Sequence, residues 1–166
     1  MKSIATITLL VSLFIAAIIA MPYVSCNKDK CKGVSCQNGG VCKSGSCSCP
    51  TGYGGANCNS AWRNKFLGNW TQAAASGSAT SATQFSVSVT GAAGIDSVAI
   101  LNFCNTFTSP VMAYLTSADT LNIPPQTVDS TLVEGYAVYL NTGKITVYYE
   151  TLGISSNVLD TVYAQW

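Results

Sequence analysis

The stretch V-E-G-Y-A-V-Y-L-N-T-G-K-I-T-V-Y-Y-E-T-L, residues 133–152, decides the fold of the larger part of this 166-residue chain. Residues 145–149 of this stretch read I-T-V-Y-Y, in which apolar and polar side chains alternate as they do along a strand with one buried face. The tripeptide N-T-G at 141–143 is a turn signal between two such runs. The stretch therefore predicts an antiparallel hairpin between residues 132–140 and 144–152.

The same period of two recurs on both sides of this hairpin. F-S-V-S-V begins at Phe85 and V-Y-A-Q-W ends the chain at Trp166, and no segment carries a convincing capped helical stripe. Strands are expected at 66–72, 84–90, 97–103, 111–116, 120–123, 132–140, 144–152 and 159–166. Because short connections favour antiparallel neighbours, residues 60–166 are predicted to form a mainly β domain of about eight strands, a barrel or a sandwich.

Composition excludes several kinds of chemistry. The chain is 48% apolar and only 9% charged, and it contains no histidine, so Ser-His-Asp and Cys-His nucleophile arrangements are absent. A net charge of +1 gives no electrostatic footprint for nucleic acid. We expect a protein that is not an enzyme, with no catalytic residue, no cofactor and no nucleic-acid partner. Glu134 and Glu150 lie on the two hairpin strands, and a hydrolase would need them to meet in a cleft, but solubility explains them more simply.

The N-terminus reads as an export signal. Residues 1–25 carry one cation, Lys2, followed by an uncharged apolar run at 4–20. This pattern is typical of a secretory signal peptide. A retained transmembrane anchor is the alternative, although the run is a little short for a bilayer core.

Six cysteines follow in the pattern C-x4-C-x5-C-x4-C-x-C-x8-C, residues 31–58. So short a segment cannot bury a core large enough to hold its fold, which predicts that disulfides take the place of the core. The spacing of the cysteines alone does not show which of them pair. The motifs C-Q-N-G-G-V-C and C-S-C-P-T-G-Y-G-G-A-N-C resemble those of an EGF-like domain over this whole segment. The resemblance implies the disulfides Cys31–Cys42, Cys36–Cys47 and Cys49–Cys58.

Metal binding is not expected in this segment. Export to an oxidising compartment and the lack of histidine argue against zinc. Calcium-binding EGF-like domains carry an acidic or amide side chain where this chain has Lys30, and a cation there opposes a divalent ion. The metal prediction is therefore none.

Two cysteines remain, Cys26 and Cys104. The run Y-V-S-C ending at Cys26 resembles a relaxed bacterial lipobox, which implies a lipid on that cysteine and a tether at 26–30 to the membrane. Cys104 is then a buried free thiol. The alternative is a secreted, unlipidated protein, in which Cys26 and Cys104 could pair with each other. Residues 26–59 carry four lysines against one aspartate, and 60–166 carry three cations against six acids. If Cys26 is lipidated, the basic part lies toward the membrane, and the alternative is a solvated charge run beside the disulfides.

The run K-F-L-G-N-W at 65–70 resembles the G-x-W opening strand of lipocalin-like barrels. With the leader, the cysteine and the EGF-like pattern, it makes the chain similar to small surface lipoproteins of Gram-negative bacteria. The resemblance implies a protein of the outer membrane or cell surface, in which an EGF-like spacer or adhesion module presents a barrel to a protein, glycan or small apolar ligand.

Aromatic residues offer two candidate binding surfaces. Ten side chains are expected to face inward: Trp70, Phe85, Val87, Val89, Ile145, Val147, Tyr149, Val162, Ala164 and Trp166. A lipocalin-like carrier would bind a small apolar molecule there, through Trp70, Phe85, Tyr149 and Trp166, but the same residues could simply fill the core. Some of the tyrosines at 136, 139, 148 and 163 must face water, where they form a recognition surface or ordinary cross-strand pairs.

Overall fold

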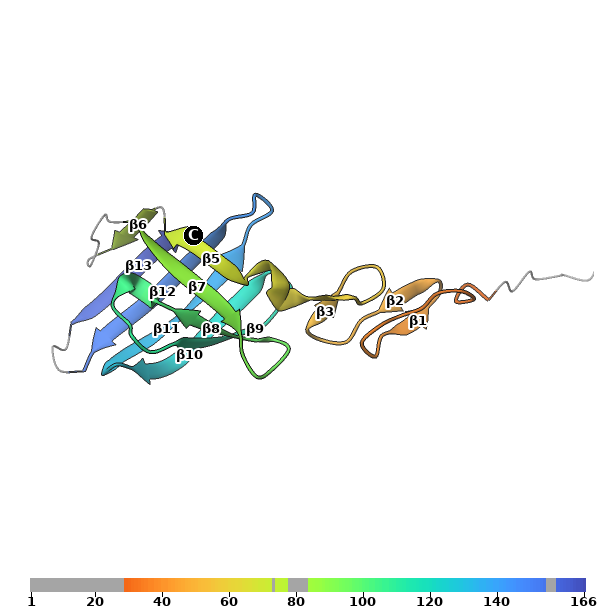
Figure 1. Ribbon diagram of the computed structural model, residues 1–166, viewed down its shortest axis with the longest axis horizontal. Coiled ribbons are helices and arrows are strands. Elements are labelled where there is room, and N and C mark those ends of the chain that lie inside the picture. The colour runs from red at the N-terminus through yellow and green to blue at the C-terminus, as the bar shows by residue number, and fades with distance from the viewer. Residues whose placement is uncertain (1–28, 73, 78–83, 155–157) are drawn as a thin grey trace, which may run out of the picture. The chain divides into compact units, whose positions relative to one another are not determined.

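The fold is known from a computed structural model, which describes residues 29–72, 74–77, 84–154 and 158–166 (Figure 1). The described chain is mainly β, as the alternation predicts, with two short 3-10 helices. Residues 31–166 form one compact unit. The leader and Cys26 lie outside the described residues.

The N-terminal part of the larger unit is a disulfide-rich segment with two small antiparallel sheets. β1 (Val41–Lys43) pairs with β2 (Ser46–Ser48), and β3 (Tyr53–Gly54) pairs with β4 (Ser60–Ala61). The cysteines are bonded in the three pairs that the EGF-like pattern implies, Cys31–Cys42, Cys36–Cys47 and Cys49–Cys58. Because β3 pairs with β4, which ends at Ala61, the second small sheet of this segment extends three residues beyond Cys58, the last cysteine of the pattern.

The second glycine of the N-G-G motif has a packing reason. A Cβ atom on Gly40 would lie 2.6 Å from Sγ of Cys58, which is itself fully buried. Gly39 before it has a φ of +79°, which L side chains adopt only with strain. The motif therefore allows a tight turn and a close approach of backbone to disulfide.

The rest of the described chain forms one antiparallel sheet in the order β5-β7-β8-β9-β10-β11-β12-β13-β6. Its strands are β5 (Gly68–Gln72), β6 (Ala74–Gly77), β7 (Phe85–Gly91), β8 (Ser97–Leu101), β9 (Val111–Leu115), β10 (Thr120–Val128), β11 (Thr131–Tyr139), β12 (Ile145–Gly153) and β13 (Leu159–Gln165). β5 and β6 follow each other closely in the chain but lie at the two edges of the sheet. They therefore bring the edges together, and the sheet forms a nearly closed barrel, which has eight strands when β5 and β6 are counted as one (Figure 1).

Each of the eight expected ranges contains a strand, so the prediction of an antiparallel β domain is confirmed, and of the two predicted forms, barrel and sandwich, the sheet has the barrel-like one. β10 is longer than expected, because it continues through Pro124 and Pro125 to Val128. The register shifts between Ile123 and Gln126, and this bulge accommodates two residues that lack a backbone N–H donor. β6 was not predicted, since A-A-S-G has no apolar alternation.

The core lies inside the barrel and consists of the inward half of each alternating strand. Of the ten side chains expected to face inward, eight are buried: Val87, Val89, Ile145, Val147, Tyr149, Val162, Ala164 and Trp166. Trp70 and Phe85 are partly buried and pack against this core. Pairing continues to the last residue, since the backbones of Trp166 and Ile145 exchange hydrogen bonds of 2.8 and 2.9 Å.

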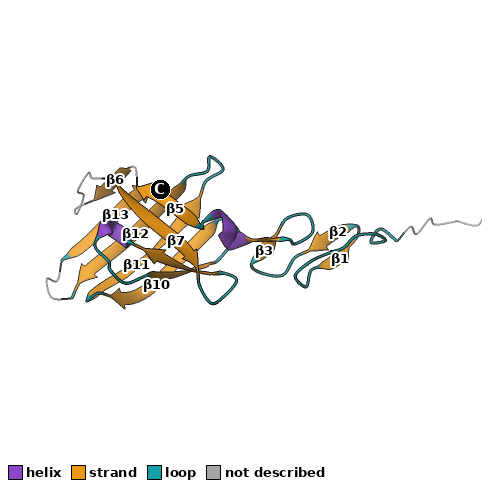
Figure 2. Cartoon of the chain, viewed as in Figure 1, coloured by secondary structure: helices purple, strands orange, loops and turns teal. Residues whose placement is uncertain are grey.

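The two 3-10 helices, drawn purple in Figure 2, lie toward different ends of the barrel. η1 (Trp62–Lys65) precedes β5 and leads into Phe66, which is almost fully buried. η2 (Phe103–Asn105) follows β8 and buries Phe103 completely. Each helix thus delivers one phenylalanine to the core.

Candidate functional site

The interior of the barrel is occupied by an aromatic cluster around Phe103. Its ring centroid lies 4.7 Å from that of Tyr149, 6.0 Å from that of Phe107 and 6.1 Å from that of Trp166. All four side chains are buried. The indole N–H of Trp166 donates to Oε1 of Gln72 at 3.4 Å, so the one buried polar side chain among the described residues has a partner.

The four candidate ligand-binding residues therefore contact other parts of the protein. Tyr149 and Trp166 both contact the ring of Phe103. Trp70 donates its indole N–H to the backbone oxygen of Phe66 at 2.7 Å, and Phe85 packs against the core. All four side chains therefore take part in packing within the core, and a role in holding a ligand stays a prediction.

Cys104 is a free cysteine beside this cluster. Burial raises the pKa of its thiol to about 12, an effect that a hydrogen bond with Tyr149 opposes only in part. Burial also raises the pKa of the Tyr149 hydroxyl. At neutral pH the thiol is therefore protonated and a poor nucleophile.

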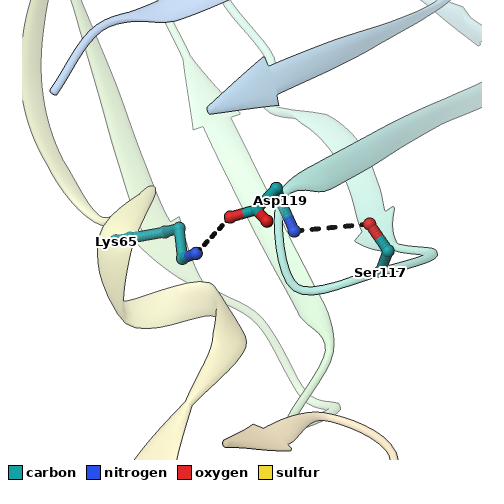
Figure 3. A network of polar contacts seen from close by, with 3 residues as sticks. All are labelled: Lys65, Ser117 and Asp119. Atoms are coloured by element: carbon teal, nitrogen blue, oxygen red, sulfur yellow. Dashed lines mark hydrogen bonds and ion pairs between the residues drawn. The ribbon is translucent and has the colours of Figure 1, made fainter. Parts of the chain in front are cut away.

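An ion pair connects the 3-10 helix η1 to a turn of the barrel. Lys65 of η1 forms an ion pair with Asp119 in the turn before β10, and the backbone N–H of Asp119 donates to Oγ of Ser117 at 3.3 Å (Figure 3). The Lys65 ammonium also lies 5.3 Å from the ring centroid of Tyr139. Tyr139 is one of the four strand tyrosines of which some were expected to face water, and it is half-buried and packs edge-on against Phe66.

Asp129 lies in the turn between β10 and β11 and binds a second loop, the one that contains Thr108 and Ser109. One carboxylate oxygen accepts hydrogen bonds from the backbone N–H and hydroxyl of Thr108, at 2.5 and 2.9 Å, and from the Ser109 N–H at 3.0 Å. The other accepts from the Ser109 hydroxyl at 2.7 Å. These bonds, those of Ser109 first, lower the carboxyl pKa to about 2. Such a group stabilises a loop and has no evident chemical task.

A different set of side chains gathers on the outer wall. The strand register places Tyr114 opposite Asn122, Asn122 opposite Tyr136, Tyr136 opposite Tyr148, and Tyr148 opposite Tyr163. All five point away from the core, because their neighbours along each strand are buried or face inward. We call these five residues the tyrosine row.

The tyrosine row is open to solvent over much of its length. Tyr163 is 54% exposed, Tyr136 47% and Tyr114 41%, and the rings of Tyr136 and Tyr148 lie 5.5 Å apart. Contiguous exposed apolar surface marks interaction sites more often than scattered single residues do. The tyrosine row is therefore the strongest candidate binding surface in the described chain.

Two carboxylates flank the row. Glu134 and Glu150 lie opposite each other on β11 and β12, two residues along from Tyr136 and Tyr148. They are thus brought together as the hairpin predicts, on the outer wall. The Tyr148 hydroxyl donates to Oε1 of Glu150 at 2.9 Å, which raises the pKa of that hydroxyl.

No protein-family model matches this chain, and no curated protein is significantly similar to it. Over the described residues, no three acidic, cysteine or histidine side chains come together as metal ligands. That same part of the chain holds no helix of the length and apolar character needed to cross a membrane. The geometry of the barrel and its outer wall therefore carries the functional argument.

Two members of the tyrosine row, Tyr114 and Asn122, were not predicted. Alternation in V-M-A-Y-L already places Tyr114 on the face opposite Val111 and Ala113. Alternation does not, however, show which residues of neighbouring strands lie opposite each other. The row is a property of register across five strands.

Proposed function

We propose that this protein is a non-enzymatic binding protein of the cell surface, whose barrel contacts its partner through the outer wall. The leader at 1–25 exports it, and a lipid on Cys26 holds it at the membrane of the cell envelope. The disulfide-rich segment is an EGF-like spacer or adhesion module. The patterns at 23–26 and 31–58 support the anchor and the EGF-like assignment.

One observation carries the choice of the outer wall, namely the packing of Phe103 inside the barrel. A carrier needs room for its ligand, whereas the ring of Phe103 contacts Phe107, Tyr149 and Trp166 and is fully buried. The tyrosine row, in contrast, presents exposed rings. Tyrosine supplies a large contact area at a small cost in conformational entropy, which suits a recognition surface.

The carrier alternative makes a distinct prediction. Trp166 contacts Phe103, so a small apolar molecule entering the barrel would change tryptophan fluorescence. If the outer wall is the binding surface, as we propose, titration of the mature protein with a fatty acid and with an apolar dye should leave that fluorescence unchanged. Saturable, stoichiometric uptake of either compound would contradict binding by the outer wall alone.

The anchor is tested separately. Cells expressing the native chain and the C26S variant are labelled with a fatty acid, and the protein is isolated from each. We expect label only on the native chain, together with membrane fractionation that the variant loses. Label that persists in C26S, or no label in either, would refute the lipid on Cys26.

A further inference from the structure

We infer that the partner on the outer wall is an extended peptide segment carrying an apolar side chain followed by arginines at alternate positions. This inference rests on the proposed function, because it names the partner of the same wall. It concerns the outward faces of three neighbouring strands, β11, β12 and β13.

Three parallel rows of side chains cross these strands. The register aligns Leu132 with Leu152 and Leu159, then Glu134 with Glu150 and Thr161, then Tyr136 with Tyr148 and Tyr163. Successive rows are two residues apart along each strand, about 7 Å. The wall therefore offers an apolar row, an acidic row and an aromatic row in that order.

Charge selects a cationic partner. Glu134 and Glu150 lie directly opposite each other, and like charges in that position destabilise a sheet. Residues 60–166 carry three cations against six acids. A positive group that docks between the two glutamates would relieve their repulsion.

The cations of this domain are engaged elsewhere. Arg63 donates to the backbone oxygens of Ala92 and Gly94 at 3.0 and 2.5 Å, and Lys65 pairs with Asp119. Lys144 donates to Oε1 of Gln165 at 3.2 Å. Within the described ranges, no lysine or arginine forms an ion pair with either glutamate, so both carboxylates can receive a cation from a partner.

The tyrosine row favours arginine over lysine as that cation. A guanidinium is planar, so it stacks on aromatic rings and also matches a carboxylate with two N–H donors. Tyr136 and Tyr163 expose about half of their surface for such stacking. One arginine on the acidic row and a second on the aromatic row would use both chemistries.

The apolar row offers a third contact, with an apolar side chain of the peptide. Leu159 is 59% exposed, beside Leu152. An extended peptide repeats its same-face side chains every two residues, about 7 Å, which equals the spacing of the rows. The sequence Leu-Ser-Arg-Ser-Arg-Ser therefore matches the order apolar, acidic, aromatic.

The test measures binding of this peptide, fluorescently labelled, to the mature protein by anisotropy. The matched probe replaces both arginines with citrulline, which keeps the shape and removes the charge. The variants are E134Q/E150Q, Y136A/Y163A and Y136F/Y163F, and D96N is the control for loss of an acid elsewhere. Thermal melting shows that each variant remains folded.

We expect the arginine peptide to bind at least about tenfold more tightly than the citrulline peptide. E134Q/E150Q and Y136A/Y163A should each weaken binding about tenfold, while Y136F/Y163F and D96N bind like the native protein. Equal binding of the two peptides, equal loss in D96N and E134Q/E150Q, or no binding would overturn the inference.

Failure of this inference can be told apart from failure of the proposed function. The same proteins are tested with a neutral glycan, a hexamer of N-acetylglucosamine, and with a fatty acid. Tyrosine-dependent binding of the glycan in place of the peptide would overturn the arginine segment and leave the outer wall as the binding surface. Uptake of the fatty acid in the interior, with no ligand on the wall, would overturn both.

Discussion

Replacing Phe103 with alanine should destabilise the barrel more than most single changes. The side chain is fully buried and contacts three other rings. Removal of a buried phenylalanine costs about 3–5 kcal/mol, through lost transfer free energy and the cavity left behind. The lost ring contacts place F103A near the upper part of that range.

The assay is urea unfolding followed by tryptophan fluorescence. With an m-value of about 1–3 kcal/mol per molar urea, a loss of about 4 kcal/mol lowers the midpoint by more than about 1 M. The matched control is Y163A, an aromatic-to-alanine change on the outer wall, where the ring is 54% exposed. A loss below about 1 kcal/mol in F103A, or equal losses in the two variants, would refute the description of a filled interior.

Two further predictions concern ionisable groups. Because hydrogen bonds from Ser109 and Thr108 lower the pKa of Asp129 from 3.8 to about 2, its contribution to stability is present above 3.8 and is lost as the pH falls toward 2. Urea midpoints between about pH 5 and pH 2 should therefore fall more steeply for the native chain than for D129N, and parallel curves would contradict this reasoning. Burial raises the pKa of the Cys104 thiol to about 12, so iodoacetamide at neutral pH should modify it only in denaturant; rapid modification of the native protein would show that it is accessible.

Much of the barrel could be predicted because its strands carry a strong local signal. Alternation at Val87 and Val89, and at Ile145 and Val147, identifies which side chains face inward, and the structure buries all four. The pairing of β6 with β13 could not be predicted, because β5 pairs with β7 at one edge of the sheet while β6, close to it in the chain, pairs with β13 at the other edge. Closure is a non-local property that no single stretch encodes.

The candidate site was predictable only in part for the same reason. Tyr136, Tyr148 and Tyr163 were recognised as strand tyrosines, and Glu134 and Glu150 as neighbours across the hairpin. Their arrangement in rows requires the register of three strands. The aromatic cluster in the interior packs around Phe103, which the prediction placed at the end of a strand and the structure places at the start of η2.

The most direct test of the central claim, that the outer wall and not the interior binds the partner, is nuclear magnetic resonance of the mature protein with labelled tyrosine and tryptophan. Spectra are recorded as the arginine peptide, the glycan and the fatty acid are added in turn. The account predicts that a binding ligand shifts the ring signals of Tyr136, Tyr148 and Tyr163 and leaves those of Tyr149 and Trp166 in place. Shifts confined to Tyr149 and Trp166 would contradict it.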